Sequence, residues 1–240
     1  MPTALISRKV HKWLSLTVGL QVALWSISGF YMVVMDLDFI HGDPLVRNLQ
    51  MPLVRTEQTA SFRDIVTRYP LATEVVLKTL PGFSHPLYEV TAANEKLLLD
   101  ARDGRRLSPL SARAAEALAR HYYAGSGEPV SVVLLTDSPP LEIQTRPLPL
   151  WRIDFDDWLA TTLYVHPDTG VLVTRRHRFW RWFDFMWMLH IMDYDERSDV
   201  NNALLRIATL LGGVGVLSGV WLLYFSFRRR RAASSGGAQS

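Results

Sequence analysis

The sequence predicts an α+β membrane protein, in which two transmembrane helices flank an outer domain of two units, each a short helix against a small antiparallel sheet. Three observations support this fold class. Two long apolar stretches without a charge lie near the two ends of the 240-residue chain. All 23 acidic residues lie between them, from Asp36 to Asp199. Within that central part, a helix, a set of strands and a turn containing glycine occur twice in the same order.

The apolar stretches cover residues 13–35 and 207–227 and are 23 and 21 residues long. Each can cross a hydrocarbon core of about 30 Å, which takes roughly 20 helical residues. A cleaved signal peptide is the alternative for the first stretch. Signal peptides, however, have a shorter apolar core and a small-residue cleavage site, which is not evident here. We therefore expect residues 13–35 to be an uncleaved anchor.

Basic residues beside the spans predict the orientation of the chain. Those in the tails, residues 1–12 and 228–240, are Arg8, Lys9, Lys12 and Arg228–Arg231. The positive-inside rule places both tails, the second of them disordered, in the cytoplasm. We therefore expect a multi-pass protein of the bacterial inner (plasma) membrane, with residues 36–178 forming a periplasmic domain. The 19 basic residues between the tails are outnumbered by the 23 acidic ones, so no nucleic-acid partner is predicted.

Small residues predict how the two spans pack together. Gly215 and Gly219 lie on one face of the second span, and Ser15 and Gly19 form a matching pair on the first. Such pairs let helix backbones approach closely in lipid. Gln21, the only amide of the first span, is predicted to form an interhelical hydrogen bond, with a transport or ligand role as the alternative. The chain has no cysteine, which excludes disulfides, covalently attached c-type haem and cysteine-ligated iron–sulfur or zinc sites.

The central region contains an internal repeat. Residues 60–70 and 111–123 read as helices, the second with Ser111 as its N-cap. Each helix is followed by strands that end in a turn, Asp103-Gly104 in the first copy and Thr169-Gly170 in the second, 66 residues apart. We expect the two copies to share one compact domain.

Residues 179–206 join this domain to the second span and begin with an aromatic run. A helix from Phe179 to Met192 would be only about 21 Å long, too short to cross the bilayer. Trp and Tyr rings settle at the membrane–water interface, so we expect an interfacial helix there. On its opposite face, Arg181 and Asp184 are three residues apart and are predicted to form an ion pair. The expected anchor residues are Phe179, Trp180, Trp182, Phe183, Trp187 and Tyr194.

Three motifs resemble PepSY-associated transmembrane (PepSY-TM) proteins. The first span and its flank resemble the first membrane helix of that family at Arg8, His11, Lys12, Trp13, Ser28 and Gly29. The string "LYVHPDTGVLV" resembles the PepSY strand–turn–strand, and Leu189-His190 followed by "LSGVWLLYF" resembles the last membrane segment with its preceding histidine. The resemblance covers nearly the whole chain and implies two PepSY-like units. The first unit departs from the pattern, since "ARDG" replaces the usual threonine–glycine turn.

The resemblance implies two different roles. Soluble PepSY domains are associated with protease propeptides and restrain peptidases. Membrane relatives include ferric-siderophore reductases, in which membrane histidines hold b-type haems. Those reductases have four membrane helices, whereas two are legible here. Haem b is therefore left open as a cofactor of this chain.

Three histidines are candidate haem ligands: His11, His41 and His190. His11 lies at the inner edge of the first span, and the other two belong to the outer side. A span of about 30 Å separates the two groups, so His11 and His190 of one chain cannot bind the same iron. A homodimer would restore four helices and could pair His11 with its symmetry mate. His190 could act with His41 or another subunit, or it could be a structural histidine.

The remaining polar residues do not signal a catalytic or metal site. Surface or turn positions are expected for His85, His121, His166 and His177. The sequence has no H-x-H or H-x-x-x-H pair and no G-x-S-x-G, Walker or G-x-G-x-x-G motif. Asp154 and Asp156 are expected to face solvent, with a catalytic carboxylate pair as the alternative. The chain alone is therefore not expected to be an enzyme; if it is one, the resemblance implies an oxidoreductase subunit.

Three functions compete at this stage. The chain is a membrane-anchored module that binds a partner, a haem-bearing electron-transfer or ferric-reductase subunit, or a periplasmic peptidase regulator. We favour an accessory protein of a redox or metal/iron-uptake system. The expected partners are the lipid bilayer and a membrane or periplasmic protein or a second copy of the chain.

Overall fold

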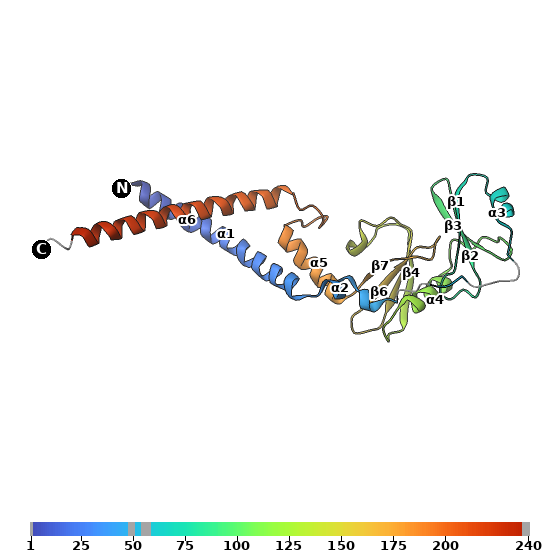
Figure 1. The fold of residues 1–240 in the computed structure, drawn as a ribbon. Helices are drawn as coiled ribbons and strands as arrows, with labels where there is room; N and C mark the ends of the chain where they lie inside the picture. The colour runs from blue at the N-terminus through green and yellow to red at the C-terminus, as the bar shows by residue number, and fades with distance from the viewer. Residues whose placement is uncertain (1, 48–50, 54–58, 237–240) are drawn as a thin grey trace. The chain divides into compact units, whose positions relative to one another are not determined.

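The computed structural model describes residues 2–47, 51–53 and 59–236. The chain divides into two compact units. The helical unit contains Met1–Met35 and Phe183–Ser240, and the sheet unit contains Asp36–Trp182. Figure 1 shows the elements of both units along the chain. The α+β fold class is confirmed in its coarse form, because two long apolar helices occur together with antiparallel sheets.

The helical unit consists of α1 (Pro2–Val34), α6 (Ala203–Gly236) and the second part of α5 (Arg178–Ile191). Two segments are long and apolar enough to cross a membrane, His11–Val34 and Ala203–Tyr224. Helix α6 runs through most of the tail predicted to be disordered, and residues 237–240 of that prediction lie outside the described part.

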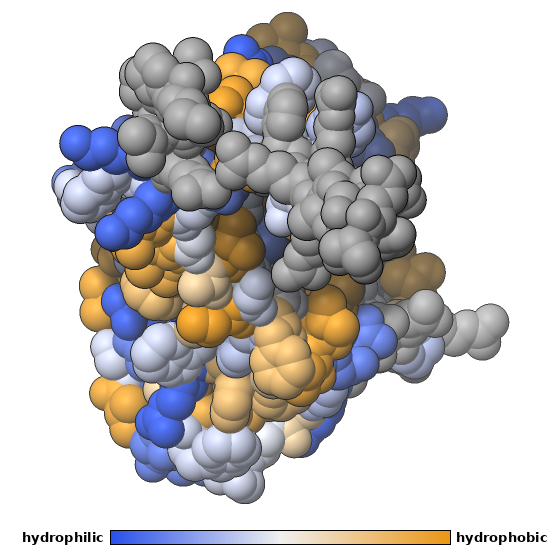
Figure 2. Space-filling model, turned by 90° about the vertical axis from the view of Figure 1, so that its left-hand side faces the viewer, coloured by the Kyte–Doolittle hydropathy of each residue, from blue (hydrophilic) through white to orange (hydrophobic). Residues whose placement is uncertain are grey.

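Both helices leave large apolar side chains exposed. Phe30 of α1 is 71% exposed and Leu210 of α6 is 70% exposed. On the face drawn in Figure 2, hydrophobic residues lie at the surface beside hydrophilic ones. In water this exposure would be costly, whereas lipid tails solvate such side chains, as expected for membrane-spanning helices.

The sheet unit begins with three short helices: α2 (Leu37–His41), η1 (Asp43–Leu45) and α3 (Phe62–Arg68). A three-stranded antiparallel sheet follows, in the order β1 (Ala72–Lys78), β2 (Leu87–Ala92) and β3 (Glu95–Asp100). Strands β2 and β3 are joined at Ala93 and Asn94, whose φ angles are 50° and 65°. Two positive φ angles in a two-residue connection are typical of a type I′ hairpin.

The second half of the sheet unit again has an α-helix followed by an antiparallel sheet, here of four strands. Helix α4 (Ala112–Tyr122) is capped by Ser111, whose side chain accepts from the backbone N–H of Ala114, as predicted. The second sheet has the order β4 (Pro129–Leu135), β5 (Leu150–Phe155), β6 (Thr162–Val165) and β7 (Leu172–Arg176), all antiparallel. Between β4 and β5 lies η2 (Leu141–Ile143).

Backbone hydrogen bonds are the same at the two turns of the internal repeat. The N–H of Gly104 donates to Asp100 O and the N–H of Gly170 donates to His166 O, at 2.8 and 2.9 Å. Both glycines have positive φ, 68° and 67°, a conformation that glycine adopts without strain. Asp100 and His166 are therefore equivalent positions in the two copies, 66 residues apart.

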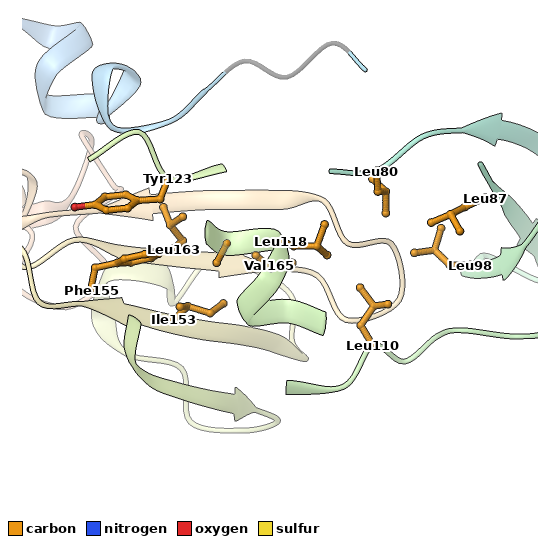
Figure 3. Close-up of a cluster of buried hydrophobic side chains, with 11 residues drawn as sticks. Leu80, Leu87, Leu98, Leu110, Leu118, Tyr123, Ile153, Phe155, Leu163 and Val165 are labelled. Carbon is orange, nitrogen blue, oxygen red and sulfur yellow. The ribbon is translucent and has the colours of Figure 1, made fainter. Parts of the chain in front are cut away.

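The two copies share one hydrophobic core. Figure 3 shows this cluster, in which Leu87 and Leu98 of the first sheet join Leu118 of α4 and Ile153 and Leu163 of the second sheet. All five side chains are fully buried. Two smaller buried clusters lie between the first sheet and α3 and between the second sheet and η2, so the shared cluster is what connects the two copies.

Candidate functional site

The candidate site lies in the helical unit, where α6 presents glycines to α1. A Cβ atom added to Gly215 would lie 3.9 Å from the side chain of Leu14, and one added to Gly219 would lie 3.4 Å from Cε1 of His11. The two helices therefore approach closely at these positions, because glycine has no side chain to separate them. At Gly219, the residue of α1 that faces this contact is His11.

The small residues predicted on α1, Ser15 and Gly19, do not contact α6 in the way that Gly215 and Gly219 contact α1. The Oγ atom of Ser15 lies 3.4 Å from Nε2 of His11 on the same helix. A Cβ added to Gly19 would meet no heavy atom of the described chain within 4 Å, so a packing partner for Gly19 stays a prediction. The interhelical bond predicted for Gln21 is not formed by its Nε2 atom, which is buried and has no partner among the described residues.

His11 binds a serine of the opposite helix. Its Nδ1 atom lies 2.7 Å from Oγ of Ser218, and that hydroxyl donates to the carbonyl oxygen of Gly215 at 2.8 Å. The next residue, Gly219, leaves room for the ring at Cε1. The imidazole is therefore held along one edge by a Ser-Gly step of α6.

His190 repeats this arrangement on α1. Its Nδ1 atom lies 3.0 Å from Oγ of Ser28, which is fully buried and donates to Leu24 O at 2.7 Å. A Cβ added to Gly29 would lie 3.4 Å from Cε1 of His190. The backbone of His190 is also fixed, because Trp25 Nε1 donates to its carbonyl oxygen at 2.8 Å.

The helical unit thus contains two histidines, each seated on a Ser-Gly step. The steps belong to different helices, Ser28-Gly29 to α1 and Ser218-Gly219 to α6. His11 and Ser28 are 17 residues apart on α1, which corresponds to about 26 Å of helix. The two seats therefore lie at opposite ends of the membrane-spanning part of α1 and cannot serve one bound ion within one chain.

Each ring has one nitrogen left for a ligand, because its Nδ1 contacts a serine. For His190, no described residue forms a hydrogen bond with Nε2, and for His11 the nearest partner of Nε2 is the hydroxyl of Ser15 at 3.4 Å. Within the described ranges, no group of three or more histidine, aspartate or glutamate side chains could hold a metal ion.

The other histidines lie in the sheet unit. His41, the third candidate ligand, ends α2 with an exposed side chain, and its carbonyl oxygen accepts from Arg175 Nε at 2.9 Å. Its role as a ligand stays a prediction. His121 is exposed at the end of α4, and His166 lies in the turn between β6 and β7, where its Nδ1 accepts from Asp168 N–H at 3.1 Å.

The surface position expected for His177 is wrong. Its side chain is fully buried, with Nε2 2.9 Å from Phe39 O and 3.1 Å from Ile40 O. Burial lowers the pKa of this imidazole, although the two carbonyl groups act in the opposite direction. The neighbouring arginines suggested exposure, but α2, which is distant in sequence, packs over the ring. His177 fastens α2 to the start of α5.

His85 also has a buried neighbour. Its Nε2 atom lies 3.1 Å from Oδ2 of Asp100, and only 14% of the His85 side chain is exposed. The hydrogen bonds from Arg102 lower the pKa of Asp100 to about 2 and outweigh the effect of its burial. Asp100 precedes the first repeat turn, so the charge cluster holds that turn together.

The aromatic run does not have one environment. Phe179 packs edge-on against Phe39 and Trp158, with ring centroids 5.5 and 5.9 Å apart, and Trp180 lies under the guanidinium of Arg176 at 3.9 Å. Trp182 and Tyr194 are half exposed, Phe183 lies 6.4 Å from the ring of Tyr31, and Trp187 Nε1 donates to Arg197 O at 3.0 Å. The interfacial location of this run stays a prediction.

The ion pair predicted between Arg181 and Asp184 is wrong. Arg181 Nε donates to Glu142 at 2.6 Å, and Asp184 pairs with Arg197. Helical spacing placed the two side chains on one face, but each finds a partner that is distant in sequence. Arg181 thereby joins α5 to η2, and Glu142 also accepts from the hydroxyl of Tyr164 at 2.6 Å.

The acidic residues Asp154 and Asp156 have structural partners. Asp154 accepts from Arg152 Nε at 3.0 Å and from the Thr162 hydroxyl at 2.8 Å, and Asp156 accepts from the backbone N–H of Glu128 at 2.6 Å. The Asp154 carboxylate therefore connects β5 to β6, and the Asp156 carboxylate connects the end of β5 to the residue before β4.

Ser28 and Ser218 are the site residues that the sequence did not single out as ligand partners. Serine is common in membrane helices, and each contact joins residues far apart, 162 positions for Ser28 and 207 for Ser218. The available signal was that each serine precedes a glycine. A Ser-Gly pair occurs once in each span.

Comparison with known proteins gives one result. A family model described as "PepSY-associated TM region" matches residues 8–239. Neither the curated proteins nor the solved structures contain a match. The matched range includes both histidines, both Ser-Gly steps and the whole sheet unit.

Proposed function

The chain belongs to the PepSY-associated TM family, and from that premise we propose that it is the membrane subunit of a redox or iron-uptake system, with haem b held by His11 and His190. The observation that supports this proposal is the repeated histidine seat. Each ring is fixed through Nδ1 and Cε1, which leaves Nε2 for iron.

The residues at each seat are of the kind that would hold a haem. Imidazole is a common axial ligand of haem iron, and a hydrogen bond at its other nitrogen orients the ring. Gly29 and Gly219 leave the helix backbone uncovered at the ring, as required where a flat group approaches a helix closely. When bound, the haem would supply one-electron transfer, and the chain's own residues hold and orient its ligands.

A second copy of the chain completes each site in this proposal. One chain supplies a single histidine at each end of the span, and about 26 Å of helix separates them. Two copies would bring four membrane helices together and pair each histidine with its symmetry mate. The dimer would then carry one haem near each face of the membrane.

The orientation follows from charge. We place both basic tails in the cytoplasm and the sheet unit in the periplasm, according to the positive-inside rule. His11 then lies near the cytoplasmic face and His190 near the periplasmic face. The periplasmic sheet unit binds a partner protein, for which the edge strand β4 is available, since Val130 and Val133 are 65% and 47% exposed and an edge strand accepts a further strand.

A visible spectrum tests this proposal. The full-length protein is purified in detergent from haem-replete cells, and reduced-minus-oxidised spectra are recorded. We expect a b-type α-band that weakens in His11→Ala and in His190→Ala. The controls His121→Ala and His166→Ala, which alter sheet-unit histidines, should retain the full band.

A haem-free wild-type preparation from these cells would overturn the haem assignment. The chain would then remain a membrane-anchored binding module. An undiminished band in both His11→Ala and His190→Ala would show that other residues hold the haem.

A further inference from the structure

Each serine of the two seats contacts both a histidine nitrogen and a carbonyl oxygen. Ser28 Oγ lies 2.7 Å from Leu24 O and 3.0 Å from Nδ1 of His190. A hydroxyl has one proton to donate, and a carbonyl oxygen only accepts. Both contacts can be hydrogen bonds only if the hydroxyl donates to the carbonyl oxygen, so His190 must carry a proton on Nδ1 and donate it to the serine.

The second seat has the same connections. Ser218 Oγ donates to Gly215 O at 2.8 Å and lies 2.7 Å from Nδ1 of His11. Serine hydroxyls in helices commonly bond back to a carbonyl one turn earlier, and here that bond leaves the oxygen lone pair for the histidine. His11 is therefore also protonated on Nδ1.

We propose that Ser28 and Ser218 are positioning residues that fix His190 and His11 in the Nδ1–H tautomer and thereby leave the Nε2 lone pair for a metal. The inference deepens the proposed function and depends on it for the identity of the metal. It matters because a histidine binds a metal only through an unprotonated nitrogen, and an unrestrained neutral histidine in water prefers the proton on Nε2.

The adjacent glycines fix the direction in which Nε2 points. Cε1 is the ring carbon between the two nitrogens, and in both seats it lies over a glycine, 3.4 Å from the Cβ position. With Nδ1 at the serine and Cε1 at the glycine, two adjacent ring atoms are held in place, and Nε2 is the next atom along the ring. The serine therefore fixes the tautomer of the histidine, and the glycine makes room for its ring.

The tautomer is measured by ¹⁵N NMR on the full-length protein in lipid bilayers. The protein is labelled at histidine, prepared without haem, and assigned with His11→Gln and His190→Gln. We expect both histidines to be protonated at Nδ1 and unprotonated at Nε2. A wild-type His190 and His11 with the proton on Nε2 would overturn the inference.

Variants separate positioning from general packing. Ser28→Ala should shift His190 toward the Nε2–H tautomer and leave His11 unchanged, whereas Ser218→Ala should do the reverse. Ser28→Thr keeps a hydroxyl and should restore the Nδ1–H form. The matched control is Ser26→Ala, because Ser26 on the same helix makes the same bond back to Val22 O, at 2.8 Å, without contacting a histidine.

Ser28→Ala or Ser218→Ala without a tautomer change would also overturn the inference. In haem-loaded protein, Ser28→Ala should raise the reduction potential, because losing the acceptor at Nδ1–H weakens electron donation to ferric iron. The tautomer experiment uses haem-free protein, so its outcome does not depend on the haem spectrum. If both histidines have the proton on Nδ1 but the protein never binds haem, the proposed function is contradicted and the inference about the serines is not.

Discussion

The Nδ1 atom of His190 lies 3.0 Å from the Oγ atom of Ser28, and this contact joins α5 to α1 across 162 residues of sequence. The contact between His11 and Ser218 repeats it on the other helix, across 207 residues. In both cases a glycine follows the serine and makes room for the ring. The two contacts thus have the same parts at opposite ends of the span, and we propose that both position a ligand.

The glycines of the seats should be sensitive to size. In Gly29→Val, the branched side chain would displace the ring of His190, since even a Cβ lies 3.4 Å from Cε1. We expect haem content to fall in Gly29→Val and in Gly219→Val. Gly213→Val is the control, because a Cβ there meets nothing within 4 Å; equal losses in the control would point to general damage to the helices.

The partly buried ion pair between Glu142 and Arg181 should contribute to the stability of the sheet unit. Glu142 is 11% exposed and accepts hydrogen bonds from Arg181 and Tyr164. These bonds lower the pKa of Glu142, although burial by itself raises it. Glu142→Gln should therefore reduce the free energy of unfolding by about 1.5–3 kcal/mol, the range for a hydrogen bond to a charged group.

Thermal unfolding of the full-length protein checks this value. The matched control is Glu116→Gln, which breaks an exposed pair with Arg120 on α4 and should cost about 0–1 kcal/mol. If Glu142→Gln lowers the free energy of unfolding by no more than this control does, the ion pair does not stabilise the fold as proposed.

Because of Asp100, the free energy of unfolding should depend on pH in the acidic range. Its folded pKa of about 2 lies below the unfolded value of about 3.9. The carboxylate therefore stabilises the folded state above the unfolded pKa, and this contribution is lost as the pH falls through about 2. The difference in Tm between wild type and Asp100→Asn should shrink as the pH falls from neutral toward 2, as measured by circular dichroism.

Asp168→Asn is the control for this titration. Asp168 lies in the corresponding turn of the second copy, where its backbone N–H donates to Nδ1 of His166 at 3.1 Å. A difference between wild type and Asp100→Asn that stays constant with pH would contradict the role of the charge.

The orientation is testable because the chain has no cysteine. Single substitutions Thr3→Cys in the first tail and Ser126→Cys in the sheet unit provide two reporters. A membrane-impermeant thiol reagent should label Ser126→Cys in spheroplasts with intact membranes and should label Thr3→Cys only after permeabilisation. The reverse pattern would place the sheet unit in the cytoplasm.

Local patterns predicted the parts of the fold that depend on nearby residues. Residues 13–35 and 207–227 carry no charge and are mostly apolar, and the structure has long helices there. The turns at Gly104 and Gly170 follow from a positive φ angle, which favours glycine whatever surrounds it. The cap at Ser111 is likewise set within one helical turn.

Long-range packing decided the rest. His177 lies among arginines in the sequence but is buried by α2, and Arg181 pairs with Glu142, 39 residues away. The histidine candidates His11 and His190 followed from a family resemblance, whereas their serine partners depend on how α1, α5 and α6 pack. No periodicity within one segment contains that information.

The ratio of haem to protein tests the central claim most directly. Haem is extracted from full-length wild type, His11→Ala, His190→Ala and the double variant, and its amount is compared with that of the chain. Two symmetric pairs in a dimer predict as many haems as chains in wild type, half that content in each single variant and none in the double variant. Haem-free wild-type protein, or full haem content in the double variant, would contradict the account.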